Sequence, residues 1–229
     1  MNKKEILRVT VSEEDIKKSY GKMSRWYPVA ERLERGVRKK GLKLLDIQEG
    51  ETVLEIGFGT GYTIAEIAKS VGETGKAYGI DVTPEMVELA NERLEKEGLL
   101  ERAELYEGDA RNMPYKNNMF DAVYMATTLE LFDTPDIPKV LGEIKRVLKP
   151  TGRLGVVSIP REGHEDSRVV KIYEWMHRTF PKYVSCRPIY VEDSIRDAGY
   201  KIIKMDEMKI AKLFPMKVVV AKPQKVDLI

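Results

Sequence analysis

Residues 52–61 read Thr-Val-Leu-Glu-Ile-Gly-Phe-Gly-Thr-Gly, a short apolar run that leads into a glycine-rich segment. The apolar run predicts a buried strand over 52–56, and Ile64, Ile67 and Val71 recur at helical spacing after the glycines. Glycines permit positive φ and let the backbone approach a ligand closely. The stretch therefore predicts a strand, a tight loop and a helix, which is the repeating unit of a parallel α/β sheet.

Strands and helices continue to alternate after this unit. Apolar stretches predict further strands over 76–81, 104–108, 120–126 and 153–159. Two more strands, 200–210 and 216–221, are joined by a link that is too short for a crossover, so this hairpin must be antiparallel. We therefore expect an α/β fold: a Rossmann-like, seven-stranded, mostly parallel sheet with an antiparallel last strand and helices on both faces.

Helical segments flank the predicted core. Residues 12–45 follow helical spacing, and Pro28 predicts a break into two helices. Residues 161–190 are expected to be a helical insertion that forms a lid with the N-terminal helices. The apolar and aromatic side chains that would wall a pocket there, or simply pack the helix, are Ile172, Tyr173, Trp175, Met176 and Phe180.

The whole chain, 1–229, is expected to be one domain. Its parts are a helical cap (1–45), a cofactor-binding core (46–160), the lid insertion (161–190) and a C-terminal helix and hairpin (191–229). Hydrophobic residues make up 42% and charged residues 33% of the chain, which is typical of a folded globular protein.

Net charge and cysteine content argue against several classes of protein and kinds of site. The net charge is +2, with 39 basic and 37 acidic residues, which argues against a dedicated nucleic-acid binder. Cys186 is the only cysteine, so the chain can form neither an intrachain disulfide nor a multi-cysteine zinc site. No apolar stretch resembles a signal peptide or a membrane span, so we expect a cytoplasmic protein. Few glutamines beside many charged residues are typical of a heat-adapted protein.

An aspartate follows the glycine loop at the sequence spacing that is typical of nucleoside-binding sites. Asp81 ends the predicted second strand, 20 residues after Gly61, where a carboxylate can accept hydrogen bonds from both hydroxyls of a ribose. The alternative is a structural turn with a helix-capping aspartate. The strand before the loop, the helix after it and the acid at the next strand end favour a nucleoside site.

The spacing of the glycines indicates which nucleoside-containing ligand the loop binds. A dinucleotide site has G-x-G-x-x-G and a pyrophosphate at the helix N-terminus, whereas this loop reads G-x-G-x-G after Glu55. An acid there would repel a pyrophosphate but suits the ammonium end of an amino acid, directly or through water. The sequence therefore favours S-adenosylmethionine (SAM) over NAD.

At this point the chain resembles the class I SAM-dependent methyltransferases. The motifs that carry the resemblance are Glu55–Gly61, Gly79–Asp81, Gly108–Ala110, Phe120–Val123 and Leu148–Leu154. The resemblance implies that Asp109 hydrogen-bonds the adenine amino group and that the backbone of Ala110 meets the ring. The expected cofactor-binding residues are Tyr20, Tyr27, Glu55, Gly57, Phe58, Gly59, Thr60, Gly61, Asp81, Val82, Met86, Asp109, Ala110 and Thr127.

A narrower resemblance is to the ubiquinone/menaquinone-biosynthesis methyltransferases. It rests on the segment around Tyr20 and Tyr27, on Asp109–Pro114, and on Phe180–Tyr190 with Gly199-Tyr200. Members of that group place an N-terminal aromatic residue over the cofactor, so Tyr20 and Tyr27 are candidates, with helix packing as the alternative. The chain departs from the group at Ala126–Phe132, which leaves the acceptor open.

Methyl transfer from a sulfonium needs no acid for its leaving group, so few catalytic residues are obligatory. Glu130, just past the fourth strand, and His164 are the candidate catalytic residues. Two distant histidines lack the spacing of a metal site, so no metal is expected.

We expect a small, hydrophobic or ring-bearing acceptor that resembles a quinone or a lipid headgroup. The alternatives are a methyltransferase acting on RNA or protein, a non-catalytic SAM-binding protein, or an NAD-dependent reductase.

Overall fold

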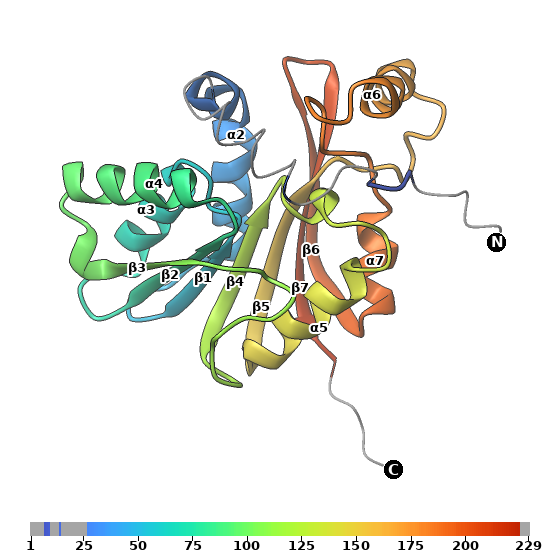
Figure 1. Ribbon diagram of the computed structural model, residues 1–229. Coiled ribbons are helices and arrows are strands. Elements are labelled where there is room, and N and C mark those ends of the chain that lie inside the picture. The colour runs from blue at the N-terminus through green and yellow to red at the C-terminus, as the bar shows by residue number, and fades with distance from the viewer. Residues whose placement is uncertain (1–6, 10–13, 15–26, 225–229) are drawn as a thin grey trace, which may run out of the picture.

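The computed structural model describes residues 7–9, 14 and 27–224, and shows one seven-stranded sheet (Figure 1). Its order is β3-β2-β1-β4-β5-β7-β6. The strands are β1 (Thr52–Ile56), β2 (Lys76–Asp81), β3 (Ala103–Glu107), β4 (Phe120–Ala126), β5 (Leu148–Ser158), β6 (Tyr200–Ile210) and β7 (Phe214–Pro223). The helices are α2 (Tyr27–Leu45), α3 (Tyr62–Ser70), α4 (Pro84–Lys96), α5 (Ile137–Val147), α6 (Arg168–Thr179) and α7 (Val191–Asp197).

Strand directions confirm the predicted fold class. β1 to β5 pair in parallel, while β7 runs antiparallel to both of its neighbours, β5 and β6. The chain order of the strands reverses between β1 and β4. In an open parallel sheet a ligand binds beyond the carboxyl ends of the strands at such a reversal, so the topology points to that edge.

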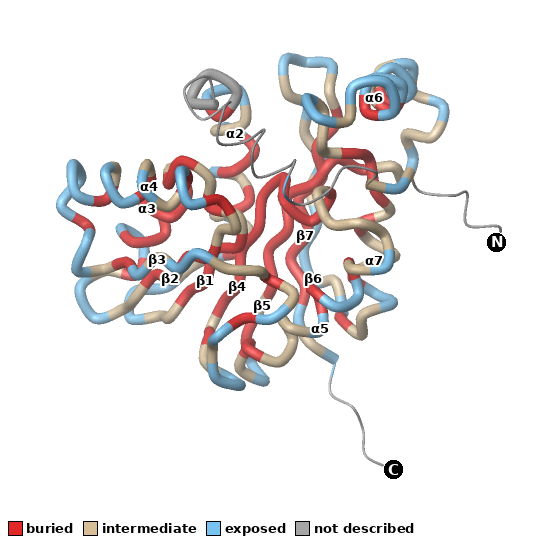
Figure 2. Tube along the Cα trace, in the orientation of Figure 1, coloured by how far each residue is buried: buried red, intermediate tan, exposed pale blue. Residues whose placement is uncertain are grey.

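Apolar clusters cover the two faces of the sheet. One cluster includes Ile144 of α5 and Ile195 of α7, and the other includes Leu45 of α2, Ile67 of α3 and Leu94 of α4. Figure 2 shows the strands as the buried centre between these helices. Helices on both faces, expected from the strand–helix alternation, are thus confirmed.

Two strands are longer than their sequence patterns predict. β5 begins at Leu148 rather than at residue 153, because Leu148 pairs with Phe120 before a register shift interrupts the ladder. β7 begins at Phe214 and includes Pro215. β5 ends opposite Lys217, so Pro215 has a strand neighbour on one side only, where a missing N–H is tolerated.

The flanking helices agree only partly with expectation. α2 begins at Tyr27 and has Pro28 in its first turn, where proline is favourable, and the helix predicted before it lies outside the described residues. α6 confirms a helix in the insertion after β5. Among the described residues, no helix is both long and apolar enough to cross a membrane.

Candidate functional site

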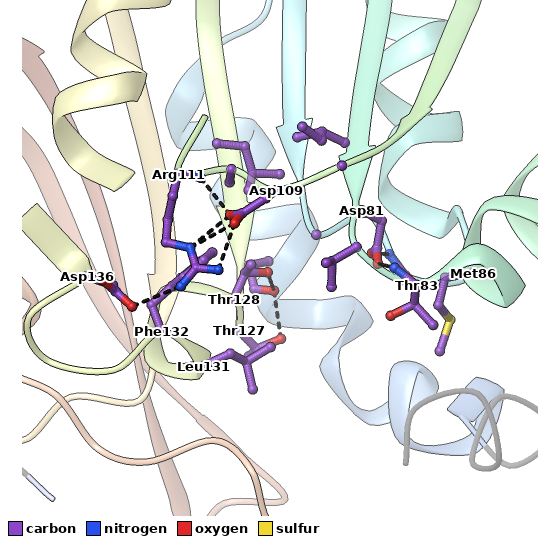
Figure 3. Close-up of a pocket in the computed structure, with 18 of the residues that line it drawn as sticks. Asp81, Thr83, Met86, Asp109, Arg111, Thr127, Thr128, Leu131, Phe132 and Asp136 are labelled. Carbon is purple, nitrogen blue, oxygen red and sulfur yellow. Dashed lines mark hydrogen bonds and ion pairs between the residues drawn. The ribbon is translucent and has the colours of Figure 1, made fainter. Parts of the chain in front are cut away.

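A cavity of about 260 Å³ lies at the carboxyl ends of β1, β2 and β4 (Figure 3). It therefore occupies the edge to which the strand order points. The residues lining it that the sequence also predicted are Gly57, Gly59, Asp81, Val82, Met86, Asp109, Ala110 and Thr127.

The glycine loop between β1 and α3 forms the floor of the cavity. Gly57, Gly59 and Gly61 all have positive φ, at 71°, 53° and 82°. A Cβ at Gly57 would lie 2.5 Å from the Thr128 hydroxyl oxygen, and one at Gly61 would lie 2.7 Å from the Ala90 Cα. Gly57 therefore lets the loop approach the end of β4, and Gly61 lets α3 pack closely on α4.

The carboxylate of Asp81 is fixed at the end of β2. Its Oδ2 accepts the Gly59 N–H at 3.0 Å and its Oδ1 accepts the Thr83 N–H at 3.0 Å. Burial raises the pKa of Asp81, and these backbone donors oppose that rise. Each carboxylate oxygen can accept a second hydrogen bond, so Asp81 can serve a ligand without releasing the loop.

Asp109 forms an ion pair that the sequence did not suggest. Arg111 Nε lies 2.9 Å and Nη2 lies 2.7 Å from Asp109 Oδ2, while Arg111 Nη1 lies 3.0 Å from Asp136 Oδ2. Figure 3 shows Arg111 between the two acids, away from Asp81. Burial opposes it, but the Arg111 hydrogen bonds hold the pKa of Asp109 below its ordinary value. Arg111 and Asp136 also line the cavity, and no spacing signal in the sequence joins them.

An N-terminal segment closes one side of the cavity with an apolar wall. Val9 lines the cavity together with Leu131 and Phe132. Asp133 holds this segment: it accepts the Val9 N–H at 3.1 Å and pairs with Arg8 at 2.6 Å. The Arg8 hydrogen bonds lower the pKa of Asp133 to about 2. No local sequence pattern predicts the place of this segment, because its contact with Asp133 spans more than 120 residues of the chain.

Thr127, at the end of β4, has an unusual backbone for a β-branched residue. Its φ is 52°, in the left-handed region that β-branched side chains rarely adopt. The hydroxyl accepts a hydrogen bond from Arg38 Nη2 at 3.0 Å and lies 3.1 Å from Glu34 Oε2, both on α2. These contacts stabilise a strained residue that lines the cavity, and strain of this kind concentrates at functional sites.

Several predicted cofactor residues lie behind the cavity rather than along it. Glu55 is fully buried, and neither carboxylate oxygen has a hydrogen-bond partner among the described residues. Burial raises the pKa of Glu55 to about 8. Phe58 packs in the apolar core, and the Thr60 hydroxyl donates to Glu31 of α2. Together with Gly61, these residues support the loop from beneath.

The predicted catalytic residues do not line the cavity either. Glu130 is fully buried, its Oε1 accepts the Ile159 N–H at 3.2 Å, and burial raises its pKa to about 7. His164 Nε2 lies 3.5 Å from Glu207 Oε2. Tyr20 lies outside the described residues, as does the side chain of Tyr27.

The insertion does not supply an apolar wall to this cavity. The side chains of Ile172, Trp175, Met176 and Phe180 are exposed and do not line the cavity. α6 turns other residues inward, including Tyr173, whose ring packs on Phe214 with centroids 4.9 Å apart. The helical spacing fixed which residues share a face but not which face would be buried.

Comparison with known proteins finds a likeness to methyltransferases that is centred on residues 53–152. Residues 53–152 match the family model described as a methyltransferase domain. A demethylmenaquinone methyltransferase of Lactobacillus johnsonii is 32% identical over 161 residues, which cover 70% of this chain and 64% of that protein. A protein of the same name from Listeria welshimeri is 26% identical, with 84% of this chain and 90% of that protein covered.

A solved structure extends the likeness to the fold. The crystal structure of a SAM-dependent methyltransferase from Aquifex aeolicus has a TM-score of 0.62 and 28% identity, with 81% of this chain and 89% of that one covered. The chain thus has the class I methyltransferase fold. It spans less than two thirds of the L. johnsonii relative.

Proposed function

We propose, from the premise that residues 53–152 form a methyltransferase domain, that the chain transfers a methyl group from SAM to a small acceptor. The observation that carries the proposal is the composition of the cavity. Fixed acids lie along its nucleoside side, and Val9, Leu131 and Phe132 form an apolar wall beside Thr127. One cavity can therefore hold a polar nucleoside and an apolar acceptor next to each other.

The residues present fit SAM, which the methyltransferase family implies as cosubstrate. Asp81 would accept both ribose hydroxyls, because two backbone N–H groups already fix its carboxylate. Asp109 would accept the adenine amino group beside the hydrogen bonds that both of its oxygens already accept from Arg111, with Nε shared between them, and the Ala110 backbone would lie beside the ring. Glu55 would balance the ammonium charge from beneath the glycine loop, since it is a buried acid whose carboxylate oxygens have no partner within hydrogen-bond distance among the described residues.

The acceptor we propose is hydrophobic or ring-bearing, similar to a quinone. The apolar wall supports this class, as do relatives named demethylmenaquinone methyltransferase. A flat ring could lie against Leu131 and Phe132 and present its edge toward Thr127.

Catalysis would consist mainly of positioning. When bound, SAM supplies a methyl group that its sulfonium already activates. The protein must then hold the acceptor in line and keep water out, and positioning can supply a large part of the rate enhancement. Glu130, buried in the turn after β4 with a pKa of about 7 and with its carboxylate on the Ile159 N–H, would act as a positioning residue for that turn. The contact of His164 with Glu207 does not support a role as base.

Labelled SAM tests the proposal directly. The purified chain is incubated with methyl-labelled SAM and, separately, with a reduced naphthoquinone bearing an apolar tail, with bulk RNA and with a protein extract. We expect label only in the organic-soluble quinone product, and a lower rate in Glu130→Gln with unchanged affinity for S-adenosylhomocysteine.

The other outcomes decide against the proposal. Label in RNA or protein would mean a macromolecular acceptor. Binding of S-adenosylhomocysteine with no label in any of the three fractions would favour a non-catalytic SAM-binding protein. A rate at the wild-type level in Glu130→Gln would remove the role given to Glu130.

A further inference from the structure

Among the described residues, exposed apolar side chains gather on α6 and next to it. We define the apolar ridge as Ile172, Trp175, Met176, Phe180, Tyr183 and Leu213. Trp175 is 58% exposed and Tyr183 is 75% exposed, although such residues are usually at least half buried. The rings of Trp175 and Phe180 meet edge to face, with centroids 6.2 Å apart. An apolar group of this size on one element indicates an interaction surface.

The same side of α6 carries positive charge. Arg168, Lys171 and Arg178 are exposed alongside the apolar ridge. The one acid of the helix, Glu174, is buried and pairs with Arg161, so it does not oppose these cations at the surface. Lys171 also pairs with Asp166, which precedes the helix. The solvent-exposed face of α6 therefore carries both apolar and basic residues.

The β6–β7 hairpin extends this surface. Leu213 is 63% exposed at the hairpin tip, beside the exposed Lys209 and Lys212. The contact between Tyr173 and Phe214 joins the tip to α6. Figure 1 shows α6 and the hairpin tip projecting together at the end of the sheet where β4 and β5 terminate. The carboxyl end of β4 also borders the cavity, so ridge and cavity belong to the same end of the molecule.

We propose that the apolar ridge docks the protein on the surface of an anionic lipid bilayer. Trp and Tyr favour the boundary between lipid headgroups and acyl chains, and helices that lie in this boundary combine apolar residues with Lys and Arg. The ridge projects from the fold, as the exposed outer side of α6 in Figure 2 shows, and such a shape suits insertion into a monolayer. Its cations complement acidic headgroups, whereas a second copy would meet it with like charges.

Vesicle sedimentation tests this docking without any acceptor or methyl transfer, so its result is independent of the proposed function. The full chain is spun with vesicles of phosphatidylglycerol and with vesicles of phosphatidylcholine. We expect it to sediment with the former, and less so as salt rises. Arg168→Gln combined with Arg178→Gln should weaken this partitioning about fivefold for each cation removed.

A matched pair of apolar variants locates the contact. Trp175→Ser with Phe180→Ser should abolish sedimentation with the vesicles. Leu100→Ser serves as the control, because Leu100 is 46% exposed but lies just before β3, at the opposite end of the sheet. Thermal unfolding of each variant identifies any that fail to fold.

Three results would overturn the proposal. One is absence of wild-type protein from the vesicle pellet at low salt. The second is equal sedimentation of the folded Trp175→Ser, Phe180→Ser variant and the wild type. The third is a dimer in sedimentation velocity that this double variant dissociates, together with no vesicle binding, which would assign the ridge to self-association.

Discussion

At the scale of single residues, the site depends on acids whose surroundings differ. Asp81 receives two backbone N–H groups, Asp109 receives a guanidinium and Glu55 receives no hydrogen bond from the described residues. The first two can hold neutral, polar parts of a nucleoside. The third has its pKa raised, mainly by burial and also by the nearby acids Asp81 and Glu31, so a bound cation would favour its ionised form.

Asp81 was a candidate because it ends a strand that the apolar pattern predicts, and Asp109 because Gly108–Ala110 resembles a methyltransferase motif. It missed Arg111, because an arginine beside an acid is common on protein surfaces and its contact with Asp136 spans 25 residues. It also expected Glu55, Phe58 and Thr60 to contact the cofactor. None of the three lines the cavity: Glu55 and Phe58 are buried, and the Thr60 hydroxyl donates to Glu31 of α2.

Glu55 should make stability depend on pH. Its pKa is raised from 4.5 to about 8 in the folded state, so between these values the folded protein keeps a proton that the unfolded chain releases. The free energy of unfolding should therefore fall as pH rises through this window, by at most about 1.4 kcal/mol per pH unit. Urea unfolding of the wild type and of Glu55→Gln at several pH values measures this pH dependence of the free energy of unfolding.

The difference between these two proteins isolates Glu55, because Glu130 and the other titrating groups are common to both. The Glu55→Gln variant should show a shallower decline. Parallel pH profiles for the two proteins would mean that Glu55 does not hold a proton in the folded state.

At the scale of elements, the sequence predicted best those strands, loops and hairpins that depend on local apolar pattern and loop length alone. The glycine loop, the strands on each side of β1 and the C-terminal hairpin follow from apolar pattern and loop length. Ends of elements were harder to predict. The early start of β5 depends on pairing with Phe120, and the early start of β7 depends on where β5 ends.

The N-terminal segment 7–9 is an element that no local pattern could assign. Its place over the cavity depends on Asp133, and on Arg187, which donates to the Leu7 carbonyl. The same limit on sequence-based prediction applies to α6, since a helical pattern does not show whether the apolar side of the helix packs on the core or faces outward.

Asp133→Ala should release the segment. The Val9 N–H loses its acceptor, so its hydrogen exchange should become about tenfold faster, which corresponds to one hydrogen bond of about 1.4 kcal/mol. Mass spectrometry of the peptide that contains Leu7–Val9 measures this rate.

Asp136→Ala is the matched control, since Asp136 also lines the cavity but pairs with Arg111 and Lys139 instead. Equal exchange rates in the wild type and in Asp133→Ala would show that Asp133 does not hold the segment.

At the scale of the whole molecule, the features on which the proposed function and the proposed docking depend all lie at one end of the sheet. The glycine loop, the fixed acids, the strained Thr127 and the apolar wall surround one cavity there, and the apolar ridge lies at the same end. This convergence follows from parallel strands, whose carboxyl ends must meet at one edge. The fold and the place of the glycine loop, Asp81 and Asp109 at this edge were therefore predictable, whereas the apolar wall combines distant segments and was not.

The most direct test of the central claim is calorimetric titration of the protein with S-adenosylhomocysteine, with NADH as the competing ligand. We predict micromolar binding of S-adenosylhomocysteine and none of NADH. In Asp81→Ala the affinity should be roughly 100-fold weaker, because two ribose hydroxyls lose a charged acceptor. Binding of NADH instead, or an Asp81→Ala affinity equal to that of the wild type, would contradict the assignment of this cavity to SAM.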